Sequence, residues 1–252
     1  MRIIDTHVHL GTSRFTEVKT TGEELIEAME RYNVISSLVM PQPTLEDISK
    51  VHQKIYDLSQ THLKKFFGIA SVDPWLSEEE YSQEIKTCME DYHFVAIKLH
   101  PLGHNISPLH PNCLKIYSLA SRYNVPVIVH TGLGNPFSLP SLVIEPARQF
   151  PSVQFILAHA GFAVYTDEAI VAADCCENIV LEPSWCPTYA VKKMIQKVGR
   201  ERIIMGSDHL TNLPVELMKY QSIGLSGDEL EKIFFSNPNR IFRLNLEKDA
   251  II

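Results

Sequence analysis

The sequence predicts an α/β fold, a single (β/α)8 TIM barrel with an additional C-terminal helix, which spans residues 1–252 as one domain. Short apolar runs alternate with amphipathic segments eight times along the chain, and 252 residues is the length that one such barrel needs. No linker, low-complexity stretch or charge run divides the chain. A doubly wound open sheet is the competing fold, but no Gly-x-Gly-x-x-Gly turn follows the first strand.

The predicted elements follow from apolar spacing and from the residues that end each run. Strands are predicted over residues 2–10, 34–40, 66–72, 94–100, 125–130, 153–159, 179–181 with Glu182 as an alternative end, and 202–205, the last running into Gly206-Ser-Asp-His209. Helices are predicted over residues 22–32, 45–63, from 77 onward, 112–123, 141–150, 167–176, 190–198, 215–222 and 227–244, the last interrupted at Asn237-Pro238. We expect Asn33 to end the first helix and Ser77 to cap the third.

The last helix carries Phe234, Phe235, Ile241 and Phe242 at helical spacing. This apolar face is predicted to cap the core. A homodimer surface is the alternative interpretation of the same face.

Composition excludes several classes of protein. A hydrophobic content of 45% and a charged content of 21% are ordinary for a globular protein, and the net charge of −7 argues against nucleic acid or an anionic membrane as a partner. No apolar run is long enough to cross a bilayer, and Asp5 within the first strand argues against a signal peptide. Five cysteines without a Cys-x-x-Cys pair indicate free thiols. We therefore expect a cytoplasmic protein that acts on a small molecule.

Polar side chains gather where the predicted strands end. Of the 11 histidines, six lie at strand C-termini: His7, His9, His100, His130, His159 and His209. In a barrel of this type the strand C-termini form the active-site face. Imidazoles with a carboxylate such as Asp208 suit a metal ion that keeps an open position for water. The sequence therefore predicts one divalent metal site at this face.

Strand alternation predicts which of these side chains point into the barrel. On the first strand, Asp5, His7 and His9 share a face. On the others, Lys98 and His100 share a face with Ala96, His130 with Ile128, His159 with Leu157 and Phe155, and Asp208 with Ile204. By the same rule we expect His209 to point away from Asp208 and to have a structural role.

Four motifs carry a resemblance that covers almost the whole chain. They are Ile4-Asp-Thr-His-Val-His9, Ile128-Val-His-Thr-Gly132, Ile156-Leu-Ala-His-Ala-Gly161 and Ile204-Met-Gly-Ser-Asp-His209. This ordered set resembles the amidohydrolase superfamily, in particular the branch with aminocarboxymuconate-semialdehyde decarboxylase and related metal-dependent hydrolases. The resemblance implies that His7, His9, His130 and Asp208 bind the metal. It also implies catalytic roles for His159 and for Asp208 as a proton acceptor.

Three further residues are expected to contact the substrate: Arg14, Lys98 and His100. For Lys98, bridging two metals as a carboxylated lysine, binding a substrate carboxylate and pairing with Asp5 are all open. His100 has a core histidine as its alternative role, and Arg14 is the expected anion contact. Asp5 either orients a ligand histidine or is a structural carboxylate at the strand.

The expected activity is hydrolysis of a C–N or C–O bond of a small polar, carboxylated substrate by a metal-activated water. A non-oxidative, metal-dependent decarboxylase is the first alternative, and a non-catalytic metal-containing binding protein is the second. One divalent ion is expected, with Zn²⁺ preferred and Mn²⁺ or Fe²⁺ as alternatives, because imidazole and carboxylate ligands suit all three.

Overall fold

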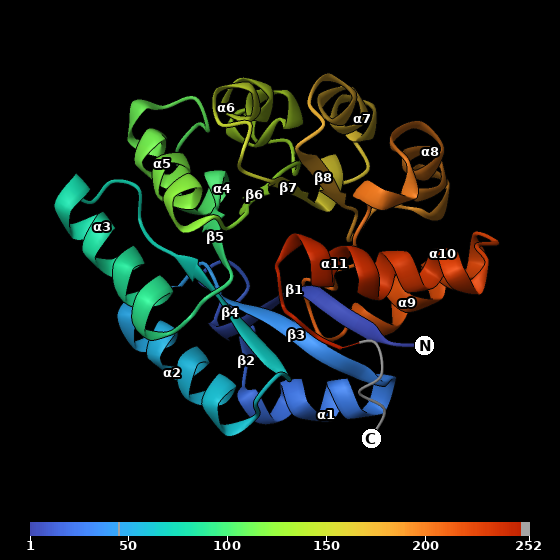
Figure 1. The fold of residues 1–252 in the computed structure, drawn as a ribbon, viewed down its shortest axis with the longest axis horizontal. Coiled ribbons are helices and arrows are strands. Elements are labelled where there is room, and N and C mark those ends of the chain that lie inside the picture. The colour runs from blue at the N-terminus through green and yellow to red at the C-terminus, as the bar shows by residue number, and fades with distance from the viewer. Residues whose placement is uncertain (45, 248–252) are drawn as a thin grey trace.

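The chain folds into a curled sheet surrounded by helices (Figure 1). The computed structural model describes residues 1–44 and 46–247. The strands follow one another in the order β2-β1-β3-β4-β5-β6-β7-β8. Their bounds are β1 Ile3–Thr12, β2 Lys19–Thr20, β3 Val34–Pro41, β4 Phe66–Ser71, β5 Ala96–Leu99, β6 Val127–His130, β7 Phe155–Ala158 and β8 Ile179–Glu182. All neighbours pair in parallel except β2, which adds a short antiparallel pair to the end of β1.

The segment after β8 closes the barrel between the last strand and the first. Ile203 pairs with Leu181 of β8, and Asp208 pairs with Val8 of β1, both in parallel. This segment is the predicted eighth strand, but it pairs only through these two isolated bridges. Residues 204–207 between these bridges form no regular ladder, and Asp208 takes a left-handed backbone conformation with φ of 65°. The (β/α)8 architecture is therefore confirmed, with an irregular closing strand.

Helices cover the outside of the sheet in chain order (Figure 1). The α-helices are α1 Gly22–Tyr32, α2 Ile48–Thr61, α3 Glu78–Lys86, α4 Pro101–His104, α5 Leu114–Tyr123, α6 Ile144–Gln149, α7 Thr166–Cys175, α8 Thr188–Val198, α9 Leu213–Ser222, α10 Gly227–Glu231 and α11 Asn237–Ile241. Five short 3-10 turns are η2 Pro111–Cys113, η3 Pro136–Ser138, η4 Pro140–Val143, η5 His159–Gly161 and η6 Arg200–Arg202, and two π-helical turns are η1 Thr87–Asp91 and η7 Lys232–Ser236.

Local sequence signals account for the helix ends. Asn33 and Asn124 end α1 and α5 in the left-handed conformation, which asparagine tolerates better than most residues. Ser77 begins α3 with a reciprocal capping box to Glu80, and its hydroxyl accepts the Glu80 N–H. The predicted last helix is divided into α10, η7 and α11, and Pro238 lies in the first turn of α11.

The buried hydrophobic residues form two clusters, one inside the barrel and one between the sheet and the helices. The inner cluster includes Ile4, Ile69, Ile128, Ile156 and Ile204. Residues of the last helical segments pack into this cluster, and Phe234, Phe235, Ile241 and Phe242 are all buried. The predicted core cap is therefore observed, and this face is not exposed for a second copy of the chain.

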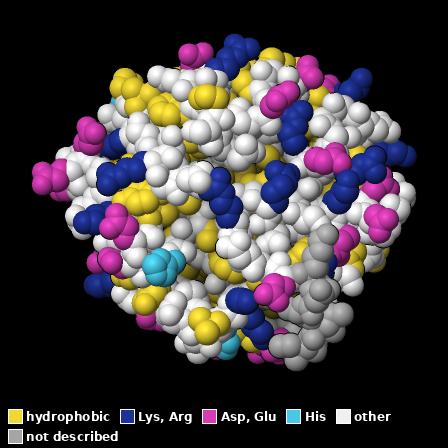
Figure 2. All heavy atoms as spheres, viewed as in Figure 1, with side chains coloured by type: hydrophobic (Ala, Val, Ile, Leu, Met, Phe, Trp, Pro, Cys, Tyr) yellow, Lys and Arg dark blue, Asp and Glu magenta, His cyan; other side chains and the backbone are white. Residues whose placement is uncertain are grey.

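Charged side chains of both signs are interspersed on the face seen in Figure 2, without a large area of one sign. Within the described residues, no helix combines the length and the apolar character that crossing a membrane would require.

Candidate metal centre

Three predicted ligand atoms meet beside the middle of β1, where Val8 pairs with Asp208. The Nε2 atoms of His7 and His9 lie 3.2 Å apart. Oδ1 of Asp208 is 3.3 Å from Nε2 of His7 and 3.1 Å from Nε2 of His9. In a tetrahedral site with metal–nitrogen distances of about 2.0–2.1 Å, neighbouring ligand atoms lie roughly 3.3 Å apart. The spacing of these three atoms fits one metal ion.

Hydrogen bonds on the far side of both rings show why this cluster suits a cation. Nδ1 of His9 is 3.0 Å from the carbonyl oxygen of Pro41, which can only accept, so Nδ1 carries the proton. Nδ1 of His7 lies 2.8 Å from Oε2 of Glu182. A ring with its single proton on Nδ1 keeps its lone pair on Nε2, and the Nε2 atoms of the two rings face each other and the Asp208 carboxylate. A positive charge between them relieves this repulsion.

His130 supplies an unsatisfied nitrogen in the same cluster. Its Nε2 is buried and has no hydrogen-bond partner within the described structure. The ring stacks on His100 at a centroid distance of 4.2 Å and meets His159 edge-on at 4.7 Å. Burial lowers the pKa of His130 well below its ordinary value, and neighbouring His159 lowers it further. A neutral imidazole with a free buried nitrogen is suited to ligate a metal.

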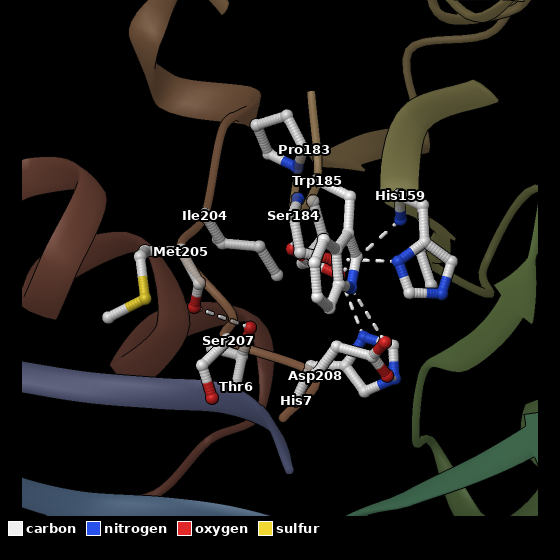
Figure 3. A network of polar contacts seen from close by, with 12 residues as sticks. Thr6, His7, His159, Pro183, Ser184, Trp185, Ile204, Met205, Ser207 and Asp208 are labelled. Atoms are coloured by element: carbon white, nitrogen blue, oxygen red, sulfur yellow. Dashed lines mark hydrogen bonds and ion pairs between the residues drawn. The ribbon is translucent and has the colours of Figure 1, made fainter. Parts of the chain in front are cut away.

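His159 enters the cluster by a turn of the backbone, which differs from the prediction. Leu157 and Phe155 face the outer layer, whereas Ile156 and Ala158 belong to the inner cluster. Strand alternation alone would therefore point His159 outward. Its φ of 65° ends the strand and turns the side chain inward, where its ring centroid lies 5.0 Å from that of His7 (Figure 3).

A similar correction applies to Asp5, which does not share a regular face with the two histidines of β1. The pairing with β3 shifts between Asp5 and Val8, where β1 carries one extra residue. The Asp5 carboxylate instead accepts hydrogen bonds from the N–H and the hydroxyl of Ser207, at 2.9 and 2.5 Å. Burial raises the pKa of Asp5 to about 7, although these hydrogen bonds oppose the rise.

Lys98 points at the same cluster. Its Nζ lies 3.3 Å from Nε2 of His7, and its side chain is 1% exposed. Burial lowers the pKa of Lys98 to about 8, while the charges of Asp208 and Glu182 act in the opposite direction. Pairing with Asp5 is not observed, because the Asp5 carboxylate is directed at Ser207.

A cavity of about 370 Å³ opens beside the histidines and is lined in part by Arg14, Lys98 and His100. This volume is in the range of small-molecule sites. Nδ1 of His100 accepts the backbone N–H of Gly103 at 2.9 Å and caps α4, so one ring nitrogen has a structural role. The guanidinium of Arg14 donates to the Gly103 carbonyl oxygen at the same cavity.

Glu182, the last residue of β8, was not among the predicted site residues. This side chain is 1% exposed and accepts the hydrogen bond of His7. Burial raises its pKa to about 7, and hydrogen bonds from Ser184 oppose that rise. The sequence signal for Glu182 is a charged residue at the end of an apolar strand, directly before a proline. Polar residues at the ends of other strands were predicted as site residues from the same kind of signal.

Trp185 covers Asp208 from the loop after β8. Its indole Nε1–H donates to Oδ2 of Asp208 at 2.8 Å (Figure 3). Its backbone N–H donates to Glu216 of α9. His209 also lies on this side, with Nε2 3.7 Å from Oδ2 of Asp208. The prediction that His209 points away from Asp208 was wrong, because the left-handed turn at Asp208 breaks the strand alternation.

Electrostatics of the cluster keep Asp208 ionised. Burial alone would raise the pKa of Asp208, but His159, His9 and His7 lower it, and the net pKa is well below its usual range. Burial lowers the pKa of His7 and His159 well below the ordinary value, so both rings are neutral at pH 7. The cluster thus presents neutral imidazoles and one carboxylate, which is the charge pattern that divalent ions such as Zn²⁺ and Mn²⁺ accept.

A family model described as "Amidohydrolase" matches residues 4–244. A comparison with curated proteins found no match. Similar solved structures include 5-carboxyvanillate decarboxylase from Sphingomonas paucimobilis, with a TM-score of 0.77 and 11% identity over 96% of this chain and 99% of that chain. The manganese-bound 5-carboxyvanillate decarboxylase from Novosphingobium aromaticivorans has a TM-score of 0.77 and 14% identity over 96% of each chain. The 4-oxalomesaconate hydratase from Rhodopseudomonas palustris has a TM-score of 0.70 and 17% identity, again over 96% of each chain.

Proposed function

The chain belongs to the amidohydrolase family of enzymes, and on this premise we propose that it is a metal-dependent decarboxylase of a small carboxylated substrate. The expected hydrolysis of a C–N or C–O bond becomes the second candidate. The observation that favours decarboxylation over hydrolysis is the hydrogen bond from Trp185 to Asp208, because it occupies a carboxylate oxygen that a general base would need.

We propose His7, His9, His130 and Asp208 as the metal ligands. The first two and Asp208 have ligand atoms at the spacing of a single ion, and His130 has a buried nitrogen without a partner. A divalent ion held there would supply a Lewis acid for substrate oxygen atoms, and it would lower the pKa of a coordinated water from about 15.7 towards about 7.

Both oxygens of Asp208 are engaged. Oδ1 faces the two histidine nitrogens, and Oδ2 accepts the indole N–H of Trp185 at 2.8 Å. A general base needs a free oxygen within hydrogen-bond reach of the water that it deprotonates. These contacts support our proposal that Asp208 acts as a ligand more than as a base, which suits decarboxylation better than hydrolysis.

Decarboxylation requires a proton at the carbon atom that loses carbon dioxide. In balance, the substrate carboxylate and one proton give carbon dioxide and a C–H bond. We propose that His159 passes this proton from solvent to the substrate carbon: Nδ1 keeps its own proton towards Ser184 at 2.7 Å, and the lone pair on Nε2 takes up a solvent proton and then delivers it. Lys98 and Arg14 would hold carboxylate groups in the adjoining cavity, and His100 would contact the substrate through its second ring nitrogen.

Hydrolysis remains as the second candidate because a water would be the fifth ligand beside the four proposed here, a coordination number that catalytic zinc sites can reach. The similarity to a hydratase, whose reaction adds water, supports it. In this reaction Trp185 would have to release Oδ2 of Asp208 before this carboxylate could accept a proton.

Metal identity and location are part of the proposal. Zn²⁺ is our first choice from the ligand types, and the manganese in one of the similar structures supports Mn²⁺ equally. All five cysteines are unpaired, which fits a cytoplasmic enzyme. We expect one ion per chain, and two ions with a carboxylated Lys98 would contradict this.

The test is a metal analysis of the purified protein, followed by parallel assays of carboxylated aromatics for carbon dioxide and of lactones and amides for hydrolysis. We expect carbon dioxide and decarboxylated product in equal amounts. Hydrolysis without carbon dioxide would support the second candidate. A metal-loaded protein without turnover on either panel would instead support the metal-containing binding protein. Trp185→Phe removes the indole donor, so it should leave decarboxylation in place and would raise hydrolysis if Asp208 were the base.

A further inference from the structure

Glu182 connects two histidines that the proposed function places in different roles. Its Oε2 lies 2.8 Å from Nδ1 of His7 and accepts the hydroxyl of Ser184 at 3.0 Å. The backbone N–H of Ser184 donates to Oε1 at 2.7 Å, and that of His159 donates to Oε2 at 3.4 Å. Backbone N–H groups can only donate, so this buried carboxyl group serves as an acceptor.

Through Ser184, the acceptor role of Glu182 also determines which nitrogen of His159 carries the proton. A serine hydroxyl has one proton, and Ser184 donates it to Glu182. Oγ of Ser184 must therefore accept from Nδ1 of His159, 2.7 Å away. The proton on Nδ1 leaves the lone pair of His159 on Nε2. In the same way, the Nδ1 proton of His7 leaves its lone pair on Nε2, which faces His9 and Asp208.

The close approach of Glu182 to His7 depends on a glycine in the closing strand. A Cβ atom at Gly206 would lie 2.6 Å from Cβ of His7 and 2.9 Å from Cδ of Glu182. Real Cβ atoms essentially never come so close, so only glycine leaves this space. The packing of three separate strands is thus adapted to this one contact.

We propose that Glu182 is a positioning residue that fixes the tautomer of two histidines at once, His7 directly and His159 through Ser184. The inference rests on the proposed function for the roles of these rings, but the hydrogen-bond pathway stands on its own geometry. The contact of Glu182 with His7 and its link through Ser184 to His159 can be tested separately, because Ser184 takes part only in the link to His159.

The first experiment measures the imidazole tautomers by ¹⁵N NMR in the zinc-loaded protein, with zinc affinity measured by competition with a chelator. In the wild type we expect His159 in the Nδ1–H form. Ser184→Ala should abolish this preference and leave the tautomer of His7 and the zinc affinity unchanged. Glu182→Gln should weaken zinc binding by about 10- to 100-fold, because partners that orient a ligand histidine typically contribute that much. Ser184→Thr keeps the hydroxyl and should restore the wild-type signals.

Ser36→Ala is the matched control. Ser36 is equally buried, and its hydroxyl donates to the carbonyl oxygen of Lys64 near the start of β3. This variant loses one hydrogen bond of the same kind far from the cluster, so neither zinc affinity nor the tautomers should change.

On a substrate that the enzyme turns over, Ser184→Ala should lower kcat by roughly 10- to 100-fold at an unchanged KM. The proposal is overturned if wild-type His159 carries its proton on Nε2, or if Ser184→Ala keeps both the Nδ1–H form and the wild-type kcat. It is also overturned if Glu182→Gln binds zinc as tightly as the wild type. A protein without turnover on any substrate would contradict the proposed function alone, because the NMR and zinc measurements do not depend on turnover.

Discussion

At the scale of single residues, the centre depends on lone pairs that are directed at one point. His9 is held by the Pro41 carbonyl oxygen and His7 by Glu182, each through Nδ1. The bond of His9 could not be made if its ring carried its proton on Nε2 alone, because a carbonyl oxygen only accepts. The residues that fix the rings therefore matter as much as the rings themselves.

His9→Ala should remove most of the metal. The substitution deletes one of three ligand atoms that meet within 3.3 Å and leaves Asp208 and His7 without the geometry of a closed site. Metal content per chain, measured by elemental mass spectrometry after dialysis, checks this. His62→Ala, a change at the C-terminal end of α2 far from the cluster, is the control. Full metal content in His9→Ala would show that the pair is structural.

Asp208→Asn should weaken metal binding, and an excess of metal should restore much of the turnover. The amide keeps one oxygen that can coordinate but loses the charge, while the hydrogen bond from Trp185 can persist. Titration of metal against activity is the measurement. If Asp208 were the general base, turnover would stay lower by about 10²- to 10⁴-fold even at saturating metal. That result would favour hydrolysis.

At the scale of elements, departures from regular strands create the site. One extra residue in β1 brings His7 and His9 to the inside, where Ile4 already points. The left-handed residue His159 at the end of β7 then turns its own side chain into the same space, and the left-handed Asp208 brings the next residue, His209, beside its carboxylate. Non-glycine residues in this conformation are uncommon and are often found at functional sites.

Gly206→Ala tests the packing between the closing strand, β1 and β8. The added methyl group would overlap His7 and Glu182, so we expect a loss of about 1–3 kcal/mol in the free energy of unfolding, as is typical of overpacking. Urea denaturation of the metal-free protein measures it. Gly227→Ala, at the start of α10, meets no atom within 4 Å and should be neutral or slightly stabilising. Equal stability of the two variants would contradict the tight contact.

At the scale of the whole molecule, the barrel buries an unusual number of titratable groups at one end. His7, His100, His130 and His159 have pKa values well below the ordinary value because they are buried, and burial lowers the pKa of His104 to about 4. Asp5 and Glu182 have pKa values raised to about 7 for the same reason. Folding without metal therefore depends on pH in two opposing ways.

The stability of the metal-free protein should rise as pH increases from about 4 to about 6.5. In this range the unfolded chain protonates five histidines that stay neutral in the folded protein, so a rise in pH favours folding. The carboxyl groups of Asp5, Glu182 and Glu216 act in the opposite direction, because burial raises their pKa values and the folded protein retains their protons to a higher pH than the unfolded chain. Five groups outweigh three, and each proton contributes roughly 1.4 kcal/mol per pH unit. Urea denaturation at several pH values with a chelator present checks this, and a flat or falling stability would contradict it.

The sequence by itself determined the order of strands and helices, the ends of α1 and α5 at asparagines, and the histidines and aspartate that gather at one end of the barrel. These features depend on residue spacing and on local backbone preferences, which can be read without coordinates. Only the tertiary structure decided that His159 turns inward, that His209 lies beside Asp208, that Trp185 covers that carboxylate and that Glu182 reaches His7. The physical reason is that these contacts join strands far apart in the chain, and they depend on an extra residue in β1, on left-handed turns and on the space at Gly206, none of which strand alternation can predict.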